Sequence, residues 1–231
     1  MTTTAPVSAT TDHAEPGHPG RIRLVAAVLA AASAVLAVLV VTHPWGERLD
    51  SSADDLVTYD YVLENHAHAW PAMFADVVAF GLIAVCLAIG VVHLVQARGR
   101  TLATIGAALV VLGGLLSAMG GLAFTTVLYF VGELPEDAGR TLVDAVNDDV
   151  AHALGAEMAG FLLFTLGSLV LAAALFRARA VPRLAIGLYV VLTVALFAGL
   201  PGTAMDVAQA AQVVLAGALA VPLLRSASLG R

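Results

Sequence analysis

Six long apolar blocks, separated by polar segments, dominate the pattern along this chain. They cover residues 24–41, 72–95, 102–131, 158–176, 184–200 and 207–224. A helix needs roughly 17–25 mainly apolar residues to cross the hydrocarbon core of a bilayer. Such a segment must be helical, because lipid offers no partner for unpaired backbone groups. The pattern therefore predicts an all-α, polytopic membrane helix bundle with six transmembrane helices.

The first block could also be read as a secretory signal peptide, with Arg21 and Arg23 as its charged region. No small-residue cleavage motif follows it, because residues 42–45 read Thr-His-Pro-Trp. We therefore expect this helix to be kept as an anchor. Residues 1–20 contain no periodic apolar positions and are expected to form a disordered cytoplasmic tail. Residues 21–231 then form a single transmembrane domain.

The composition agrees with a membrane location. Hydrophobic residues make up 60% of the 231 residues and charged residues only 12%, whereas a soluble domain carries about 25% charged residues. One soluble core of this size could not hide so much apolar surface from water. The single cysteine, Cys86, excludes a disulfide within the chain. All 11 basic residues are arginine, which, with the bias toward Ala, Val, Leu and Gly, is typical of a bacterial protein.

Arginine placement decides the predicted orientation. If six helices alternate in direction, one side of the membrane receives nine arginines: Arg21, Arg23, Arg98, Arg100, Arg177, Arg179, Arg183, Arg225 and Arg231. Only Arg48 and Arg140 fall on the other side. Because cytoplasmic segments carry the excess positive charge, we expect both termini in the cytoplasm and the protein in the bacterial plasma (inner) membrane.

The two long connections, residues 43–70 and 132–157, are acidic and fall on the extracytoplasmic side in this topology. Apolar residues recur in them at intervals of three and four: Leu56, Tyr59, Leu63, His66 and Trp70 in the first, and Leu142, Val146, Val150 and Leu154 in the second. This spacing places them on one face of a helix. We predict two amphipathic outer helices, the second running into the fourth block. Pro71 suits the first turn of the second transmembrane helix.

Histidines and carboxylates in these outer segments suggest a metal site. If the two predicted outer helices meet, Glu64, His68, Asp148 and His152 could supply four ligands to zinc or another divalent ion. No compact signature such as H-E-x-x-H joins them in the sequence, and a solvated polar face explains the same residues. The sequence shows no other cofactor site and no catalytic set.

Three acidic residues lie at membrane depth: Asp76, Glu157 and Asp206. Ionisable groups within transmembrane segments often mark ion or proton routes. All three lie near the N-terminal ends of predicted helices, where the helix dipole stabilises a carboxylate. Only Asp76 is more than one turn inside its block. It is therefore the candidate for a proton or cation pathway.

Small residues form a stripe on the third predicted helix. Gly113, Ser117 and Gly121 are spaced four apart, which allows another helix backbone to approach closely. The stripe serves either packing within the bundle or association of two protomers. There is no P-loop, no G-x-S-x-G elbow and no basic stripe for nucleic acid.

One segment carries a resemblance to a known family. Residues 182–187 read Pro-Arg-Leu-Ala-Ile-Gly and open the fifth apolar block. This helix entry resembles an uncharacterised bacterial domain-of-unknown-function family of multi-pass membrane proteins. The resemblance implies a membrane location and brings no catalytic residues with it.

The concentration of patterned polar sequence on one side leads to our first functional hypothesis. We expect a non-enzymatic inner-membrane protein whose acidic extracytoplasmic cap binds a protein partner or a small ligand. One alternative is a small proton- or cation-coupled transporter that uses Asp76. The other is a metal-dependent membrane enzyme.

Overall fold

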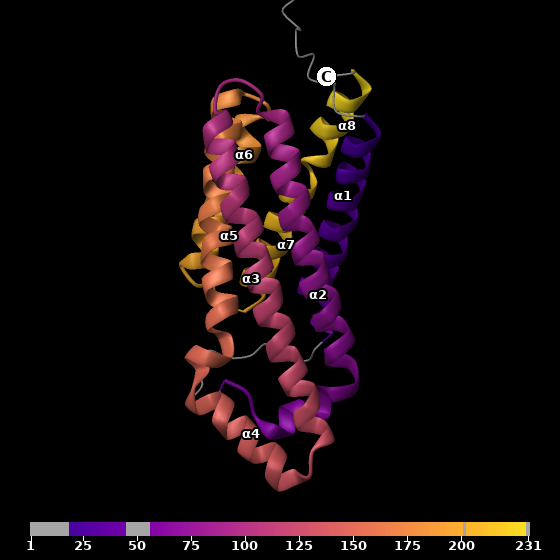
Figure 1. The fold of residues 1–231 in the computed structure, drawn as a ribbon, viewed down its shortest axis with the longest axis vertical. Coiled ribbons are helices and arrows are strands. Elements are labelled where there is room, and N and C mark those ends of the chain that lie inside the picture. Colours follow the sequence, from indigo (N-terminus) through magenta and orange to yellow (C-terminus); the bar gives the residue numbers. More distant parts are fainter. Residues whose placement is uncertain (1–18, 45–55, 201, 230–231) are drawn as a thin grey trace, which may run out of the picture.

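The computed structural model describes residues 19–44, 56–200 and 202–229. Within these ranges the chain is helical and has no strand. The helices are α1 (Pro19–Thr42), α2 (Tyr59–Leu94), α3 (Arg100–Glu133), α4 (Glu136–Asp148), α5 (Val150–Ala178), α6 (Arg183–Phe197), α7 (Thr203–Gly217) and α8 (Ala220–Ser228). They form an elongated bundle, with α4 lying across one end and α8 at the other (Figure 1). The tail predicted for residues 1–20 falls almost wholly outside the described residues.

Five helical segments are long and apolar enough to cross a membrane: α1, α2, α3, α5, and α7 taken together with α8. The chain is therefore built as a membrane protein. The predicted block 184–200 forms α6, which has 15 residues. At 1.5 Å per residue α6 rises about 22 Å, less than the roughly 30 Å hydrocarbon core. By length alone α6 falls short of a full crossing, so the sixth transmembrane helix stays a prediction.

The helices differ from the predicted blocks at two places, and a proline lies at or near each. Pro71 does not begin a separate transmembrane helix, because α2 runs continuously from Tyr59 and contains Pro71 in its interior. Figure 1 shows α2 bent near its N-terminal end; an interior proline kinks a helix by removing one N–H donor. The predicted block 207–224 is divided into α7 and α8. Pro222, in the first turn of α8, cannot donate to Ala218 and its ring crowds that carbonyl.

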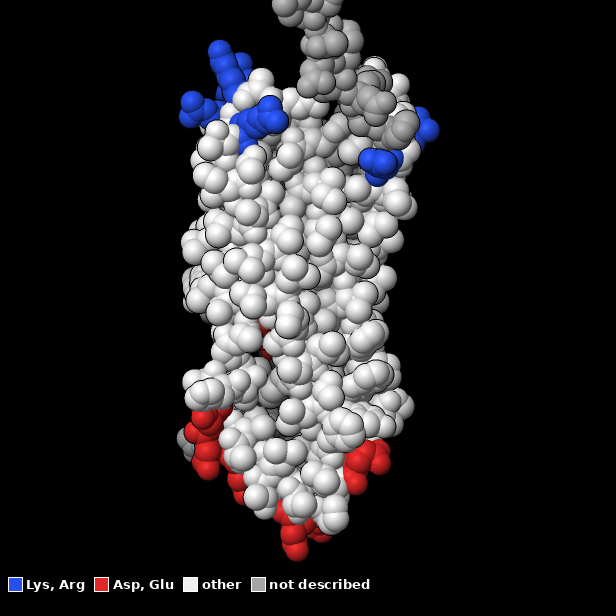
Figure 2. All heavy atoms as spheres, viewed as in Figure 1, with Lys and Arg blue, Asp and Glu red and all other residues white. Residues whose placement is uncertain are grey.

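The two ends of the bundle carry opposite charge. Figure 2 shows Lys and Arg gathered at one end, Asp and Glu at the other, and a nearly uncharged flank between them. On α5, 20 residues separate Glu157 from Arg177. That separation corresponds to about 30 Å of helix, the thickness of the hydrocarbon core. The charge pattern is thus spaced to match a bilayer.

A small core of its own stabilises the acidic end. Buried side chains there come from the segment before α2 and from α2, α3 and α4: Val57, Tyr59, Val62, Phe124, Leu128, Val131, Val143 and Val146. Asn147 adds a polar clasp. Its Oδ1 accepts from the backbone N–H of Val57 (3.2 Å), and its Nδ2 donates to the Val57 carbonyl oxygen (2.9 Å). This pair fixes the start of α2 against α4, 90 residues further along the chain.

We expect Asn147→Ala to loosen this end of the bundle. The substitution leaves a backbone donor and acceptor unsatisfied, which costs about 1–3 kcal/mol. Amide hydrogen exchange at residues 57–62 should accelerate, while exchange in the middle of α3 stays unchanged. Asp144→Ala, an exposed position on the same helix, is the control. Equal exchange in both variants would show that the clasp contributes nothing.

α3 and α5 approach each other backbone to backbone through glycines. Gly106, Gly113 and Gly120 recur every seven residues on α3, and Gly160 and Gly167 are seven apart on α5. A β-carbon added at Gly160 would lie 2.7 Å from the carbonyl oxygen of Gly113. Added at Gly167, it would lie 2.7 Å from the backbone nitrogen of Val110. These positions have no room for any side chain, so glycine sets the distance between the two helices.

The predicted stripe on α3 lies inside the bundle. Gly113 packs on the backbone of α5, and Ser117 packs on Gly160 of the same helix. Gly121 instead faces Val77 of α2. The stripe is therefore used for packing within one chain. Association of two protomers through these residues stays a prediction.

Two glycines on α5 give a matched test of this contact. Gly160→Ala should destabilise the protein by about 1–3 kcal/mol, because the backbone of α3 must move to admit the methyl group. A β-carbon at Gly155 would meet no atom within 4 Å. Gly155→Ala should therefore be neutral or stabilise by up to about 1 kcal/mol through reduced chain entropy. Thermal unfolding of both variants checks this, and equal melting temperatures would contradict it.

Candidate functional site

The outer residues predicted to bind a metal lie on exposed surfaces. Glu64 and His68 are exposed on α2, Asp148 ends α4, and His152 lies in the first turn of α5. Among the described residues, no group of three or more His, Cys, Asp or Glu side chains is arranged to hold a metal ion. The four-ligand site stays a prediction.

His152 is instead engaged with Asp149, which caps the N-terminus of α5. The two side chains meet at 2.7 Å between Nδ1 and Oδ2, and the backbone N–H of His152 also donates to the carboxylate. These hydrogen bonds lower the pKa of Asp149 below its usual value. A lowered folded-state pKa means that the contribution to stability is present above the ordinary carboxylate pKa. It is lost as the pH falls through the lowered value.

Aromatic side chains gather where α2 and α3 approach the acidic end. The ring of His66 stacks on Tyr129 with centroids 4.8 Å apart, and Trp70 packs on both Tyr129 and Phe74. His66 Nε2 also lies 2.9 Å from the Tyr129 carbonyl oxygen. Aromatic belts of this kind lie at the water interface of membrane proteins. The cluster marks that level of the bundle on α2 and α3.

Asp206 lies in the first turn of α7, and Gly202 is the N-cap residue of that helix. Its Oδ2 is 3.0 Å from Nε2 of His43, which follows the end of α1. The first turn of a helix stabilises a carboxylate because its unpaired N–H groups carry partial positive charge. This pair joins α1 to α7 at the level of the other membrane-edge carboxylates.

Asp76 lines a large cavity between the helices. The cavity has a volume of about 970 Å³ and receives side chains from α1, α2, α5, α6 and α7. Asp76 and Phe80 of α2 contribute to its lining, together with residues of α6 and α7. Figure 2 shows a small acidic patch recessed in the apolar flank, away from the acidic end. Among the residues predicted as a metal site or an ion pathway, Asp76 is the one in the lining of this cavity.

Aromatic rings form much of the cavity wall. Five of them contribute: Phe80, Phe161, Phe164, Tyr189 and Phe197. Phe80 and Phe164 contact each other with centroids 4.6 Å apart. The faces of such rings carry partial negative charge and attract organic cations.

A polar group faces the cavity from α6 and α7. Gln212 Nε2 donates to Thr193 Oγ1 at 2.7 Å, and Thr193 donates to the Tyr189 carbonyl oxygen at 2.8 Å. The Tyr189 hydroxyl lies close to the side chains of Ser168 and Gln212. Gln209, one turn before Gln212, also lines the cavity. These groups supply neutral donors and acceptors opposite the carboxylate.

The parts of α2 and α5 that carry Asp76 and Glu157 meet at Gly121 of α3, where a β-carbon would lie 3.2 Å from Cγ2 of Val77, the residue after Asp76. The Glu157 carboxylate lies over Gly121 of α3, where a β-carbon would be 3.7 Å from its Cδ atom. Within the described part of the chain, no ion pair or hydrogen bond involves either side-chain carboxylate. The bundle therefore places two acidic groups together without a basic residue between them.

Most residues of this site carry no strong signal in the sequence. Thr193, Gln209 and Gln212 stand as isolated polar residues within apolar blocks, and such positions could have been flagged. The phenylalanines could not, because a ring facing a cavity and a ring facing lipid have the same pattern. Comparison with family models, curated proteins and solved structures finds no match to this chain.

Proposed function

We propose that this membrane protein binds a small organic cation in the intramembrane cavity, with Asp76 as the counter-ion. The observation that carries the proposal is the position of Asp76 on the wall of a cavity of about 970 Å³. Like the alternative of a small proton- or cation-coupled transporter, this proposal uses Asp76; transport and ion coupling stay predictions. Binding by the acidic cap and a metal-dependent activity stay predictions.

A carboxylate at this position favours a positively charged ligand. Ionised groups within a membrane are costly unless they are paired. Two unit charges 4 Å apart attract by about 4 kcal/mol at an effective dielectric constant of 20, compared with about 1 kcal/mol in water. Glu157 adds a second negative charge nearby. A bound cation would neutralise this local excess.

The cavity wall favours an organic cation over a metal ion. Divalent ions such as calcium or magnesium take six or more oxygen ligands in close geometry. The wall around Asp76 is instead rich in aromatic rings, with a few amide and hydroxyl groups. An ammonium group can pair with the carboxylate while its carbon atoms contact the rings. We place the arginine end in the cytoplasm by the positive-inside rule, so the Asp76 half of the cavity lies toward the outer side.

We expect Asp76→Asn to weaken binding of benzylamine at least about tenfold, because the amide removes the counter-charge while keeping the size of the side chain. The dissociation constant would be measured by titration calorimetry with protein in phosphatidylcholine nanodiscs. Benzyl alcohol, the neutral ligand of similar shape, should bind both proteins weakly and equally.

The control is Asp144→Asn, which removes an exposed acidic group from α4. It should bind benzylamine as the unmodified protein does. Equal affinity of Asp76→Asn and the unmodified protein for benzylamine would refute the proposal. Tighter binding of benzyl alcohol than of benzylamine would do the same.

A further inference from the structure

We infer that the cation bound at Asp76 is a single-chain amphiphilic amine whose hydrocarbon chain occupies a second, apolar pocket deeper in the bundle. This inference rests on the proposed function, because Asp76 supplies the charge that holds the amine. It adds the chemical class of the ligand and a second binding site. The apolar pocket supplies the evidence.

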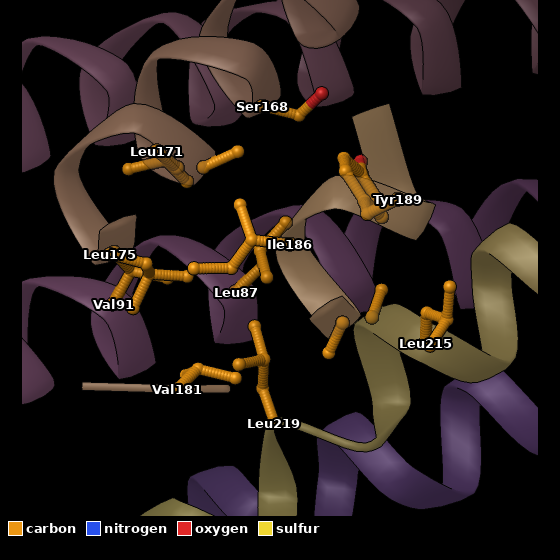
Figure 3. Close-up of a pocket in the computed structure, with 13 residues that line it drawn as sticks. Leu87, Val91, Ser168, Leu171, Leu175, Val181, Ile186, Tyr189, Leu215 and Leu219 are labelled. Atoms are coloured by element: carbon orange, nitrogen blue, oxygen red, sulfur yellow. The ribbon is translucent and has the colours of Figure 1, made fainter. Parts of the chain in front are cut away.

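The second pocket lies between α2, α5, α6 and α7 and has a volume of about 50 Å³. Figure 3 shows aliphatic side chains converging on it, with Ile186 and Leu87 near its centre and Leu171, Leu175 and Leu219 around them. Its lining includes no charged side chain. It is therefore suited to a hydrocarbon group.

The hydroxyl groups of the two polar side chains in this lining, Ser168 and Tyr189, already lie near other polar groups of the protein. The Ser168 hydroxyl donates to the Thr165 carbonyl oxygen at 2.9 Å. The Tyr189 hydroxyl lies close to Ser168 and Gln212. Cavities with apolar walls stay dry and accept apolar guests. A hydrocarbon chain would restore the dispersion contacts that an empty pocket lacks.

The apolar pocket borders the cavity at Asp76. Tyr189 and Ala216 line both spaces. On α2, one face serves both, with these residues in order from the acidic end: Asp76, Phe80, Ile83, Leu87 and Val91. Their spacing of three and four residues places them on a single stripe.

The same change from aromatic to aliphatic occurs on the facing helix α5. Its lining residues, in the same direction, are Phe161, Phe164, Thr165, Ser168, Leu171, Ala172 and Leu175. Phe161, Phe164 and Thr165 line the cavity at Asp76. The other four, of which only Ser168 is polar, line the second, apolar pocket, which we call the inner pocket. A ligand lying along this path would meet a negative charge first, then aromatic rings, then hydrocarbon. That sequence of environments matches an amine with an alkyl tail.

The length of the path indicates the length of the tail. Asp76 and Leu87 are 11 residues apart on α2, which corresponds to about 16 Å at 1.5 Å per residue. An extended chain advances about 1.2 Å per bond. An amine with about twelve carbons therefore reaches the inner pocket, whereas a four-carbon amine does not. A phospholipid fits less well, because its phosphate would meet the negative charge of Asp76.

The test compares n-dodecylamine with n-butylamine in phosphatidylcholine nanodiscs, after subtraction of binding to empty nanodiscs. Ala185→Phe on α6 and Ala172→Leu on α5 fill the inner pocket from two directions. Each variant should bind n-dodecylamine at least tenfold more weakly and n-butylamine within twofold of the unmodified protein. Leu184→Phe, next to Ala185 but 84% exposed, is the control and should change neither.

Using two pocket variants protects the test against misfolding of either one, which size-exclusion chromatography and thermal unfolding would reveal. Unchanged n-dodecylamine binding in the folded variants would overturn the inference. Equal weakening of both amines would also overturn it. Loss of a co-purified phospholipid from these variants in native mass spectrometry would assign the pocket to bilayer lipid instead.

Asp76→Asn separates this inference from the proposed function. If the proposed function holds, this variant weakens both amines. If it weakens neither, the proposed function fails. If Asp76→Asn weakens binding of both amines but the pocket variants bind n-dodecylamine as the unmodified protein does, the alkyl-chain site is refuted and the proposed function stands.

Discussion

The backbone contact between α3 and α5 determines where the polar groups inside this bundle lie. Because Gly113 and Gly160 leave no space for a side chain between the two helices, the helices pack at the shortest distance that their backbones allow. A β-carbon at Gly120 would lie 2.5 Å from the backbone nitrogen of Glu157. The same contact thus holds Glu157 over Gly121 and near Asp76.

The other half of the bundle is built differently. α6 has 15 residues and ends at Phe197, and the chain then passes through Gly199, which has a positive φ of 74°. Residues at this break, including Gly199 and Gly202, line the cavity. A helix of full length would pack along α7 and α5 and fill that space. The cavity therefore exists where close packing on one side meets a shortened helix on the other.

The inner surfaces of this membrane protein change gradually along its axis. Near the acidic end, the helices present carboxylate, amide and aromatic groups to the cavity. Toward the arginine end, the same faces present Leu, Ile and Val. This gradient of polarity belongs to residues that line the internal spaces of the bundle. The proposed binding of an amphiphilic amine rests on this gradient.

Much of the architecture could be predicted from composition and periodicity, because the bilayer imposes helix length and apolar character on any sequence that spans it. Asp76 could also be singled out from the sequence as a candidate functional residue, because it lies more than one turn inside an apolar block. The clasp of Asn147 on Val57 was not, because it joins residues 90 positions apart. Nor was the break between α7 and α8, because it lies in a segment with the hydropathy of an unbroken span.

The sequence by itself determined that this chain is helical, belongs in a membrane and separates arginine from acidic residues at a spacing near the bilayer thickness. These properties depend on each residue's own partition between water and lipid. Only the tertiary structure decided that Asp76 lines a cavity, that five aromatic rings line the same cavity and that an apolar pocket borders it. Those properties depend on which faces of separate helices meet, and helices in lipid meet through packing. The decisive residues for that packing are glycines, whose spacing the sequence shows but whose partners it does not.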